Sequence, residues 1–92
     1  PLPTPAQRSQ LLRLFLGRLR TAFDADEVAA RLASQTDGLG GRDLRSLVER
    51  AVQRAAGRAL RQGTAERVEL QLDDLLAELP ALSPASDPLM ER

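Results

Sequence analysis

The sequence predicts an all-α fold, a small four-helix bundle built around one core. The core must be aliphatic, because 42% of the 92 residues are hydrophobic and only 2% are aromatic. All prolines lie outside residues 6–79, and a stretch of this length without proline favours helices. Within it, apolar residues recur every three or four positions, the period of a helix that buries one face. The length allows a single domain.

The first predicted helix covers residues 5–21, and Pro5 suits its first turn because that position needs no amide hydrogen. Its apolar stripe is wider than one core contact requires, which leaves two interpretations open. Either the whole stripe is buried in the bundle, or part of it faces something outside. The stripe consists of Leu11, Leu12, Leu14, Phe15, Leu16 and Leu19.

The second predicted helix covers residues 25–36. Asp24 and Glu27 have the spacing of a capping box, in which two side chains satisfy free amides at a helix start. Gly38 suits the left-handed conformation that follows many helix ends, and two adjacent glycines after it predict a tight, closely approachable turn. The buried face of this helix is Val28, Ala29, Leu32 and Ala33.

The third predicted helix covers residues 42–62 and ends near Gly63. Its core-facing stripe is Leu44, Leu47, Val48, Ala51, Ala55 and Ala59. A second stripe beside it consists of Arg50, Arg54, Arg58 and Arg61. These arginines form either a ridge that binds phosphate groups or another subunit, or a solvated flank whose aliphatic stems cover the core edge. The zero net charge of the chain favours the solvated flank.

The last part of the chain combines a connector, a helix and a tail. Residues 67–70 alternate in polarity over too short a length for a sheet, so they predict an extended connector. The fourth predicted helix covers residues 72–79, and its buried face is Leu72, Leu75, Leu76 and Leu79. From Pro80 onward proline, alanine and serine dominate, so we expect residues 81–92 to form a flexible tail. The helical domain then covers residues 1–80.

The composition excludes several classes of chemistry within these residues. The chain has no cysteine and no histidine, which removes thiol nucleophiles, disulfides, the commonest metal ligands and the imidazole base. All its basic residues are arginine, which excludes a catalytic or phosphate-binding lysine. Thirteen basic residues balance thirteen acidic ones, so there is no bulk attraction to nucleic acid or to an anionic membrane.

The sequence also indicates where the domain resides. No apolar run approaches the roughly 20 residues that span a bilayer, and residues 1–5 do not resemble a signal peptide. We therefore expect a soluble, cytoplasmic domain. Because the chain opens on Pro1 without a methionine, we interpret it as a piece of a longer protein.

Three segments, in order, resemble one family. Residues 32–44 read Leu-Ala-Ser-Gln-Thr-Asp-Gly-Leu-Gly-Gly-Arg-Asp-Leu, and Leu47-Val48 and Ala51 follow. This resembles the signature of the C-terminal helical lid of AAA ATPases, Leu-Ala-x-x-Thr-x-Gly-aromatic-Ser-Gly-Ala-Asp-Leu and then Leu-x-x-x-Ala. Leu2-Pro3 with Arg8 and Leu11-Leu12 resembles the start of the lid. Residues 70–79 resemble its end, with Asp74, Leu75 and Leu79 in register. The resemblance spans residues 2–80 and implies an AAA lid-like bundle.

The chain departs from the family pattern at four positions. Thr4 replaces an Asp, and Gly40 replaces the Ser that would cap the third helix, which leaves Asp43 with half of a capping box. Phe15 stands where many members carry a His near the nucleotide ribose. Phe keeps an apolar face for the base and loses a hydrogen bond. Arg42, the fourth departure, replaces an Ala.

Arg42 has two interpretations. In the wider superfamily an Arg near the start of this helix, called sensor 2, reaches the terminal phosphate of the nucleotide. A guanidinium beside a helix N-terminus is a suitable phosphate contact, since the free amides there already favour anions. Alternatively, Arg42 is a surface residue paired with Asp43 or Glu27.

The resemblance implies a nucleotide-binding site. In the family, adenine lies in the hinge between the lid and a larger αβα ATPase subdomain. Matched residue by residue, Leu11, Phe15, Gly41 and Arg42 line the lid's side of that cleft and bind ATP. No lid residue is catalytic, and the Mg²⁺ ion is held by the ATPase subdomain of the parent chain.

The resemblance also implies a function and partners. The lid completes the nucleotide cleft and couples ATP binding and hydrolysis to subunit movement in a ring. Its partners are the large ATPase subdomain of the same chain and neighbouring subunits of a homohexamer, with no membrane or nucleic acid among them. The 92 residues lack a Gly-x-x-x-x-Gly-Lys-Ser/Thr loop and the acidic pair that hydrolysis needs. We therefore expect the parent chain to be an ATP hydrolase and the fragment alone to be inactive.

Two other functions use the same sequence features. A stand-alone helical adaptor would bind a protein partner through the wide apolar face of the first helix, but it would give the glycine turn no role. A DNA-binding helical domain would use the arginine stripe, and its affinity would fall steeply with salt.

Overall fold

The computed structural model describes residues 1–82. It contains four α-helices and one turn of 3₁₀ helix: α1 (Pro5–Leu16), α2 (Ala25–Ala33), α3 (Gly41–Gln62), η1 (Ala65–Arg67) and α4 (Leu72–Leu82). The prediction of an all-α fold with four helices is therefore confirmed. Of the predicted tail, residues 81 and 82 belong to α4, and residues 83–92 lie outside the described part of the chain.

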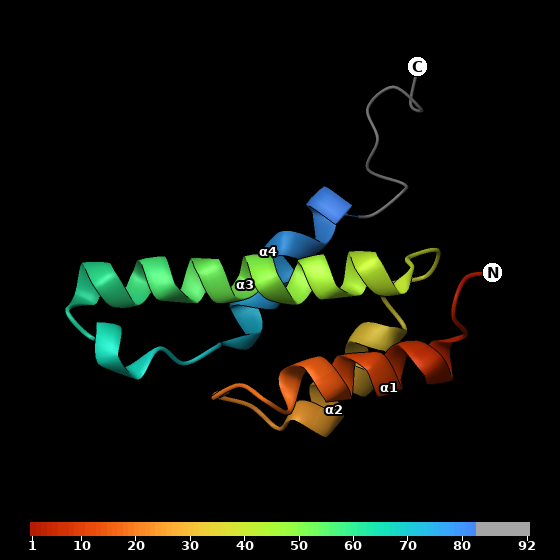
Figure 1. The fold of residues 1–92 in the computed structure, drawn as a ribbon, viewed down its shortest axis with the longest axis horizontal. Helices are drawn as coiled ribbons and strands as arrows, with labels where there is room; N and C mark the ends of the chain where they lie inside the picture. The colour runs from red at the N-terminus through yellow and green to blue at the C-terminus, as the bar shows by residue number, and fades with distance from the viewer. Residues whose placement is uncertain (83–92) are drawn as a thin grey trace, which may run out of the picture.

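The long helix α3 organises the molecule. Its 22 residues extend over about 33 Å at 1.5 Å per residue. Figure 1 shows α1 and α2 together on one side of α3, and α4 crossing it on another side. Contacts join α1 to α2, α1 to α3 and α3 to α4. Both α1 and α4 are therefore held against the same spine.

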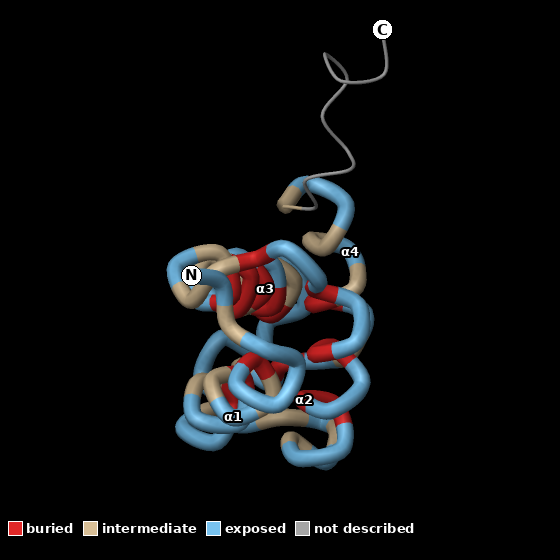
Figure 2. The backbone as a smooth tube through the Cα atoms, turned by 90° about the vertical axis from the view of Figure 1, so that its right-hand side faces the viewer, coloured by how far each residue is buried: buried red, intermediate tan, exposed pale blue. Residues whose placement is uncertain are grey.

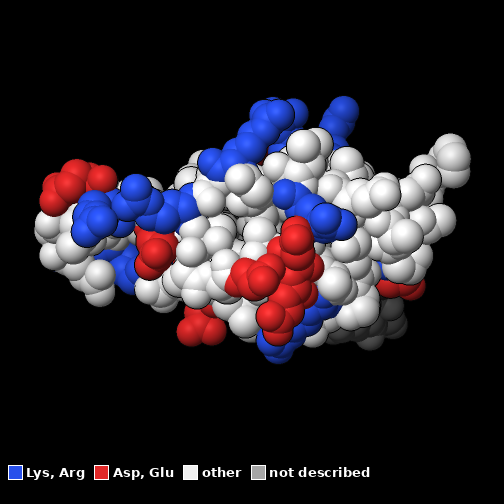
Figure 3. All heavy atoms as spheres, turned by 90° about the horizontal axis from the view of Figure 1, so that it is seen from below, with Lys and Arg blue, Asp and Glu red and all other residues white. Residues whose placement is uncertain are grey.

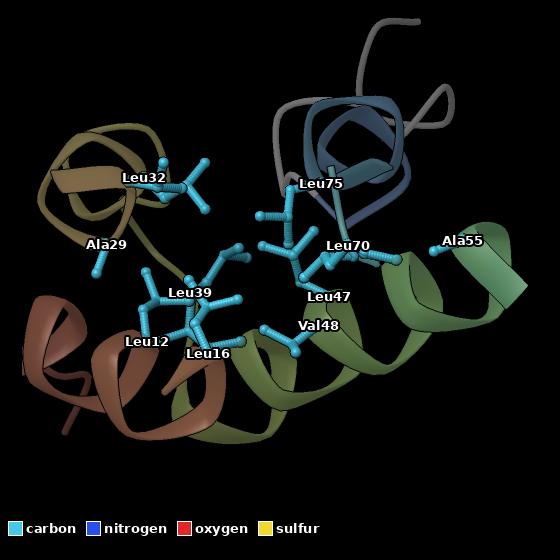
Figure 4. Packing of buried hydrophobic residues seen from close by; sticks show 13 residues of the cluster. Leu12, Leu16, Ala29, Leu32, Leu39, Leu47, Val48, Ala55, Leu70 and Leu75 are labelled. Atoms are coloured by element: carbon cyan, nitrogen blue, oxygen red, sulfur yellow. The ribbon is translucent and has the colours of Figure 1, made fainter. Parts of the chain in front are cut away.

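The core is aliphatic, as the composition predicts. It is formed by all four α-helices, the turn before α3 and the segment before α4, whose buried side chains meet in the middle of the molecule (Figure 4). All four predicted core residues of α2 and all six of α3 are buried. Figure 2 shows this burial as inward-facing patches on each helix, with exposed backbone around them. Hydrophobic periodicity thus identified the buried faces of these two helices correctly.

The first helix is shorter than predicted, because it ends at Leu16 instead of residue 21. The amide of Gly17 closes the helix by donating to the carbonyl of Arg13 at 2.9 Å. A Cβ atom at Gly17 would lie 2.8 Å from that same oxygen, so only glycine fits here without a shift. The chain then turns away so that Thr21 can pair with Leu70 in an isolated parallel β-bridge. A tertiary contact has replaced the last predicted turn.

The second helix ends at Ala33, three residues earlier than predicted. Thr36 is 1% exposed, and its hydroxyl donates to the carbonyl of Leu32 at 2.9 Å, so a side chain satisfies the helix end. Gly38 follows with φ of 84°, in the predicted left-handed conformation. At the start, Asp24 caps the helix by accepting from the amide of Glu27 at 3.2 Å. Among the described residues, Glu27 returns no bond, so the capping box is only half formed.

The fourth helix runs past its predicted end at residue 79 and continues through Pro80 to Leu82. Pro80 sits in the last turn, where the missing amide costs only one hydrogen bond. Leu79 and Leu82 are half-buried against the core, which favours the continued helix. Before α4 the predicted connector includes the end of η1 and then Leu70, which is 2% exposed and pairs with Thr21.

Candidate functional site

The start of α3 has the half capping box that the sequence predicts. Gly40 is the N-cap residue and offers no side-chain hydrogen bond. Its amide donates to Oδ2 of Asp43 at 3.0 Å. Because no side chain occupies the N-cap position, free amides of the first turn remain available to an anion.

Leu11 of α1 faces Gly41 at the start of α3. A Cβ atom added to Gly41 would lie 3.7 Å from Cδ1 of Leu11, which is an ordinary van der Waals distance. Among residues 1–82 only Gly38 and Gly63 have positive φ, so the backbone at Gly41 accepts any residue. The missing side chain therefore leaves room for about a methyl group beside Leu11, and the backbone of Gly41 can be approached closely there.

Phe15 lies one helical turn further along α1, in a shallow open groove between α1 and α3. Apolar side chains provide most of the accessible lining, and charged and amide groups stand around it. The lining residues are Phe15, Arg18, Leu19, Arg45, Val48, Glu49, Val52 and Gln53. Phe15, Leu19 and Val52 are each half-buried against the core, so their outer faces stay accessible. The groove can accept a flat apolar group against the Phe15 ring.

Arg42 is exposed in the first turn of α3, directly after Gly41. It forms no ion pair with any described residue, while Asp43 is engaged with the amide of Gly40. The interpretation of Arg42 as a surface residue paired with Asp43 or Glu27 therefore lacks support in the structure. Of the four predicted site residues, Gly41 faces Leu11 and Phe15 lies one turn along the seam between α1 and α3, whereas Arg42 only follows Gly41 in the chain and has no described contact with the other three.

Leu14 is the exposed leucine of α1. Leu14 is 54% exposed, whereas Leu12 and Leu16 are completely buried. The wide stripe is thus neither fully buried nor fully open. Part of it faces outward, as one of the two interpretations expected.

The arginine stripe of α3 is neither a free ridge nor a simply solvated flank. Arg54 donates to Oε2 of Glu78 on α4 at 2.6 and 3.1 Å, and Arg50 lies 3.9 Å from the same carboxylate. Arg58 pairs with Asp74. Three of the four arginines therefore join α3 to α4. Figure 3 shows the molecule from the side on which α1 and α2 lie, where acidic and basic side chains are also found side by side.

The pair of half-buried Arg58 and buried Asp74 could not be identified from the sequence. The two terminal nitrogens of the Arg58 guanidinium donate to Asp74, Nη1 at 2.6 Å and Nη2 at 3.0 Å, and the amide of Gln71 donates to Asp74 at 2.8 Å. Burial alone would raise the pKa of the Asp74 carboxyl, but these hydrogen bonds, with the charges of Arg58 and Arg54, hold it below the ordinary value. The hydrogen bonds to Asp74 also raise the pKa of Arg58.

Arg8 is a second buried charge that sequence reasoning missed, since it entered only as one position of a motif. The side chain is 3% exposed, and it donates twice to the carbonyl oxygen of Ala33, at 2.8 and 3.1 Å. A third hydrogen bond goes to the carbonyl of Pro3 at 3.0 Å. Backbone acceptors carry no residue type, so no sequence pattern could have indicated these partners.

Residues 1–82 offer no cluster of three or more acidic side chains that could hold a metal ion. No helix in this part of the chain is long and apolar enough to cross a membrane. Comparison with protein-family models and with curated proteins finds no match for the chain. The assignment of a function therefore depends on the seam between α1 and α3.

Proposed function

We propose that this chain is the lid subdomain of an AAA ATPase. In this role it completes a nucleotide-binding cleft and couples ATP binding and hydrolysis to movement of subunits in a ring. The observation that carries the proposal is that Gly41 faces Leu11 without a side chain between them. The backbone conformation at Gly41 does not require glycine, so we explain the missing side chain by the close approach of a ligand.

Each residue of the seam has a role in this proposal. Leu11 and Phe15 supply an apolar surface for the adenine ring. Gly41 lets the base approach the backbone of α3. Arg42, exposed beside the free amides of the first turn, reaches the terminal phosphate as a sensor 2 arginine. The ATP and its Mg²⁺ ion are otherwise held by the large ATPase subdomain of the parent chain.

Coupling follows from a difference in affinity. A nucleotide that touches both the lid and the ATPase subdomain binds the closed arrangement more tightly than the open one, so ATP shifts the equilibrium toward closure. Movement of the lid then reaches the neighbouring subunit of a homohexamer. Arg42 contributes to this difference only if it contacts phosphate in the closed state.

The proposal predicts an effect of Gly41→Ala on nucleotide affinity in the parent chain. The added Cβ makes only an ordinary contact with Leu11, so we expect the fold and thermal stability to be kept. The methyl group occupies the space left for adenine, and we expect the KM for ATP to rise about tenfold, or about 1.4 kcal/mol of binding. Steady-state ATPase kinetics measure this change.

The matched control is Gly57→Ala in the same helix. A Cβ at Gly57 meets only the flexible end of Arg61 at 3.4 Å, away from the seam. Its KM should equal that of the wild type. An unchanged KM in Gly41→Ala would reject the site, and unchanged turnover and ATP affinity in Arg42→Ala would reject the sensor 2 role.

Sequencing the gene upstream of the Pro1 codon, over about 200 residues, tests the family directly. A Gly-x-x-x-x-Gly-Lys-Thr loop followed by an apolar strand ending in Asp-Glu is the expected result. An unrelated upstream domain would refute the lid. A helical adaptor would then lead, because Leu14 and the groove at Phe15 offer an apolar surface to a protein partner.

A further inference from the structure

The segment before α1 is fastened to the rest of the domain at several points. Arg8 donates to the carbonyl of Pro3 at 3.0 Å, and the side chain of Gln7 accepts from the amide of Thr4 at 2.9 Å. Thr4 in turn caps α1 by accepting from the amide of Gln7 at 3.2 Å. Leu2 reaches the start of α3, where its Cδ2 lies 3.8 Å from the position of a Cβ on Gly40.

The Arg8 guanidinium is the group that links this segment to α2. Ala33 is the last residue of α2, and its carbonyl is one of those that lack an amide partner within the helix. The negative end of the helix dipole favours a cation at this position. The nearest carboxylate, that of Asp37, lies 3.9 Å away and is 97% exposed, so the backbone carbonyls supply the close contacts.

The shape of the arginine side chain suits this junction. Arginine presents several N–H donors in a planar fork, which here serves two carbonyl oxygens on separate segments. Lysine would offer a single point charge and could not hold both carbonyls in the same geometry. The contact therefore fixes the direction of the chain at Pro3 as well as its distance from α2.

We infer that Arg8 is a positioning residue that makes residues 2–4 part of the same rigid body as α2 and the start of α3. The inference rests on the proposed function, in which the ATPase subdomain precedes this segment. A movement of Leu2 is then transmitted to α2 and to the start of α3, and the hinge between the two subdomains lies before Leu2. Without the Arg8 contacts, the first residues of a domain ordinarily fray.

Backbone relaxation of the 92-residue protein by NMR tests the rigid body without any nucleotide. In the wild type we expect the Leu2 amide to have an order parameter near ~0.85, as in rigid backbone, and NOEs from the Leu2 methyls to Gly40. In Arg8→Met we expect the Leu2 order parameter to fall below about 0.6 and those NOEs to vanish, while α3 stays rigid.

The control is Arg13→Met on the same helix, which loses only an exposed ion pair with Asp26 and should leave Leu2 unchanged. If Arg8→Met does not fold, Arg8→Lys replaces it, with partial loss of Leu2 order expected. A mobile Leu2 in the wild type would overturn the inference. So would an ordered Leu2 in the folded Arg8 variant.

Kinetics of the parent chain separate this inference from the proposed function. In Arg8→Lys we expect kcat to fall while the KM for ATP stays the same, because the residues that touch nucleotide are unchanged. A parent chain without ATPase activity would refute the proposed function and leave the NMR result standing. An active parent in which Arg8→Lys has wild-type kcat would refute the coupling role of Arg8.

Discussion

The carboxylate of Asp74 both caps a helix and forms an ion pair with a neighbouring helix. It accepts from the amide of Gln71, which directly precedes α4, and it pairs with Arg58 of α3. Arg58 also donates to the carbonyl of Glu69 in the connector, at 3.2 Å. One side chain thus caps α4 and, through Arg58, joins it to α3 and to the segment between them.

This arrangement makes stability depend on pH in a predictable direction. The folded-state pKa of Asp74 lies below the unfolded value, so the pair stabilises the protein fully above about pH 5. That contribution is lost as pH falls through the folded-state pKa. We expect Asp74→Asn to be less stable than the wild type by about 1 to 2 kcal/mol at pH 7. Arg58 retains some solvent access, which favours the lower value.

Urea unfolding of both proteins between pH 7 and pH 2 checks this prediction. The two proteins differ only at residue 74, so the difference between the two free energies of unfolding isolates Asp74. The difference should shrink as the solution is acidified. A difference that stays constant with pH would show that the Asp74 pKa is ordinary.

The structural roles of some single residues could be predicted from the sequence, and those of others could not. Gly38 and Asp43 were identified correctly because their roles depend on the neighbouring backbone, which follows from short spacings. Asp74 and Arg8 entered only as positions in a pattern. Their partners are distant side chains and backbone carbonyls, which no local spacing encodes.

Among the secondary-structure elements, α3 shows two opposite uses of glycine. Gly57 lies inside the helix with ordinary dihedral angles, and a Cβ there would meet only the mobile end of Arg61. Gly63 ends the helix with φ of 73°, a conformation that strains any other residue.

We therefore expect alanine to have opposite effects at these two positions. Gly57→Ala should raise the free energy of unfolding by about 0.5 to 1 kcal/mol through helix propensity. Gly63→Ala should lower it by about 1 kcal/mol, because alanine tolerates the left-handed region poorly. Chemical denaturation of the two variants and the wild type measures both changes in the free energy of unfolding. Equal signs for the two changes would contradict the assignment of the helix end.

The lengths of the elements could be predicted only in part. The start and end of α3 matched the sequence because a glycine lies at each boundary and six buried positions keep the helical period. Helix α1 was predicted too long because Leu19 continues the stripe beyond Gly17. The backbone there instead serves Leu70, far along the chain, which a local pattern cannot indicate.

In the whole molecule, two hydrogen bonds join the first half of the chain to the second. The amide of Leu70 donates to the carbonyl of Arg20 at 2.9 Å, and the amide of Ala22 donates to the carbonyl of Leu70 at 2.8 Å. These bonds hold the loop after α1 against the connector before α4. Leu70 is buried at this junction, so the two halves share one core.

We expect the Leu70 amide to exchange its hydrogen as slowly as buried amides of α3 such as that of Ala55. Amides in irregular connectors normally exchange fast, and the amide of Arg67 in exposed η1 is the internal comparison. Native-state hydrogen exchange by NMR measures all three. Fast exchange at Leu70 would show that the junction opens independently of the core.

The junction between Thr21 and Leu70 also bears on the order of folding. The turns between α1 and α2 and between α3 and α4 need only local chain closure, whereas this junction closes a loop that contains both α2 and α3. Closing the larger loop costs more chain entropy, so the junction forms once the helices are in place. The hydrogen bond of the Leu70 amide then breaks only when the two halves of the domain separate. Exchange at Leu70 would thus read out the free energy that holds the two halves of the domain together.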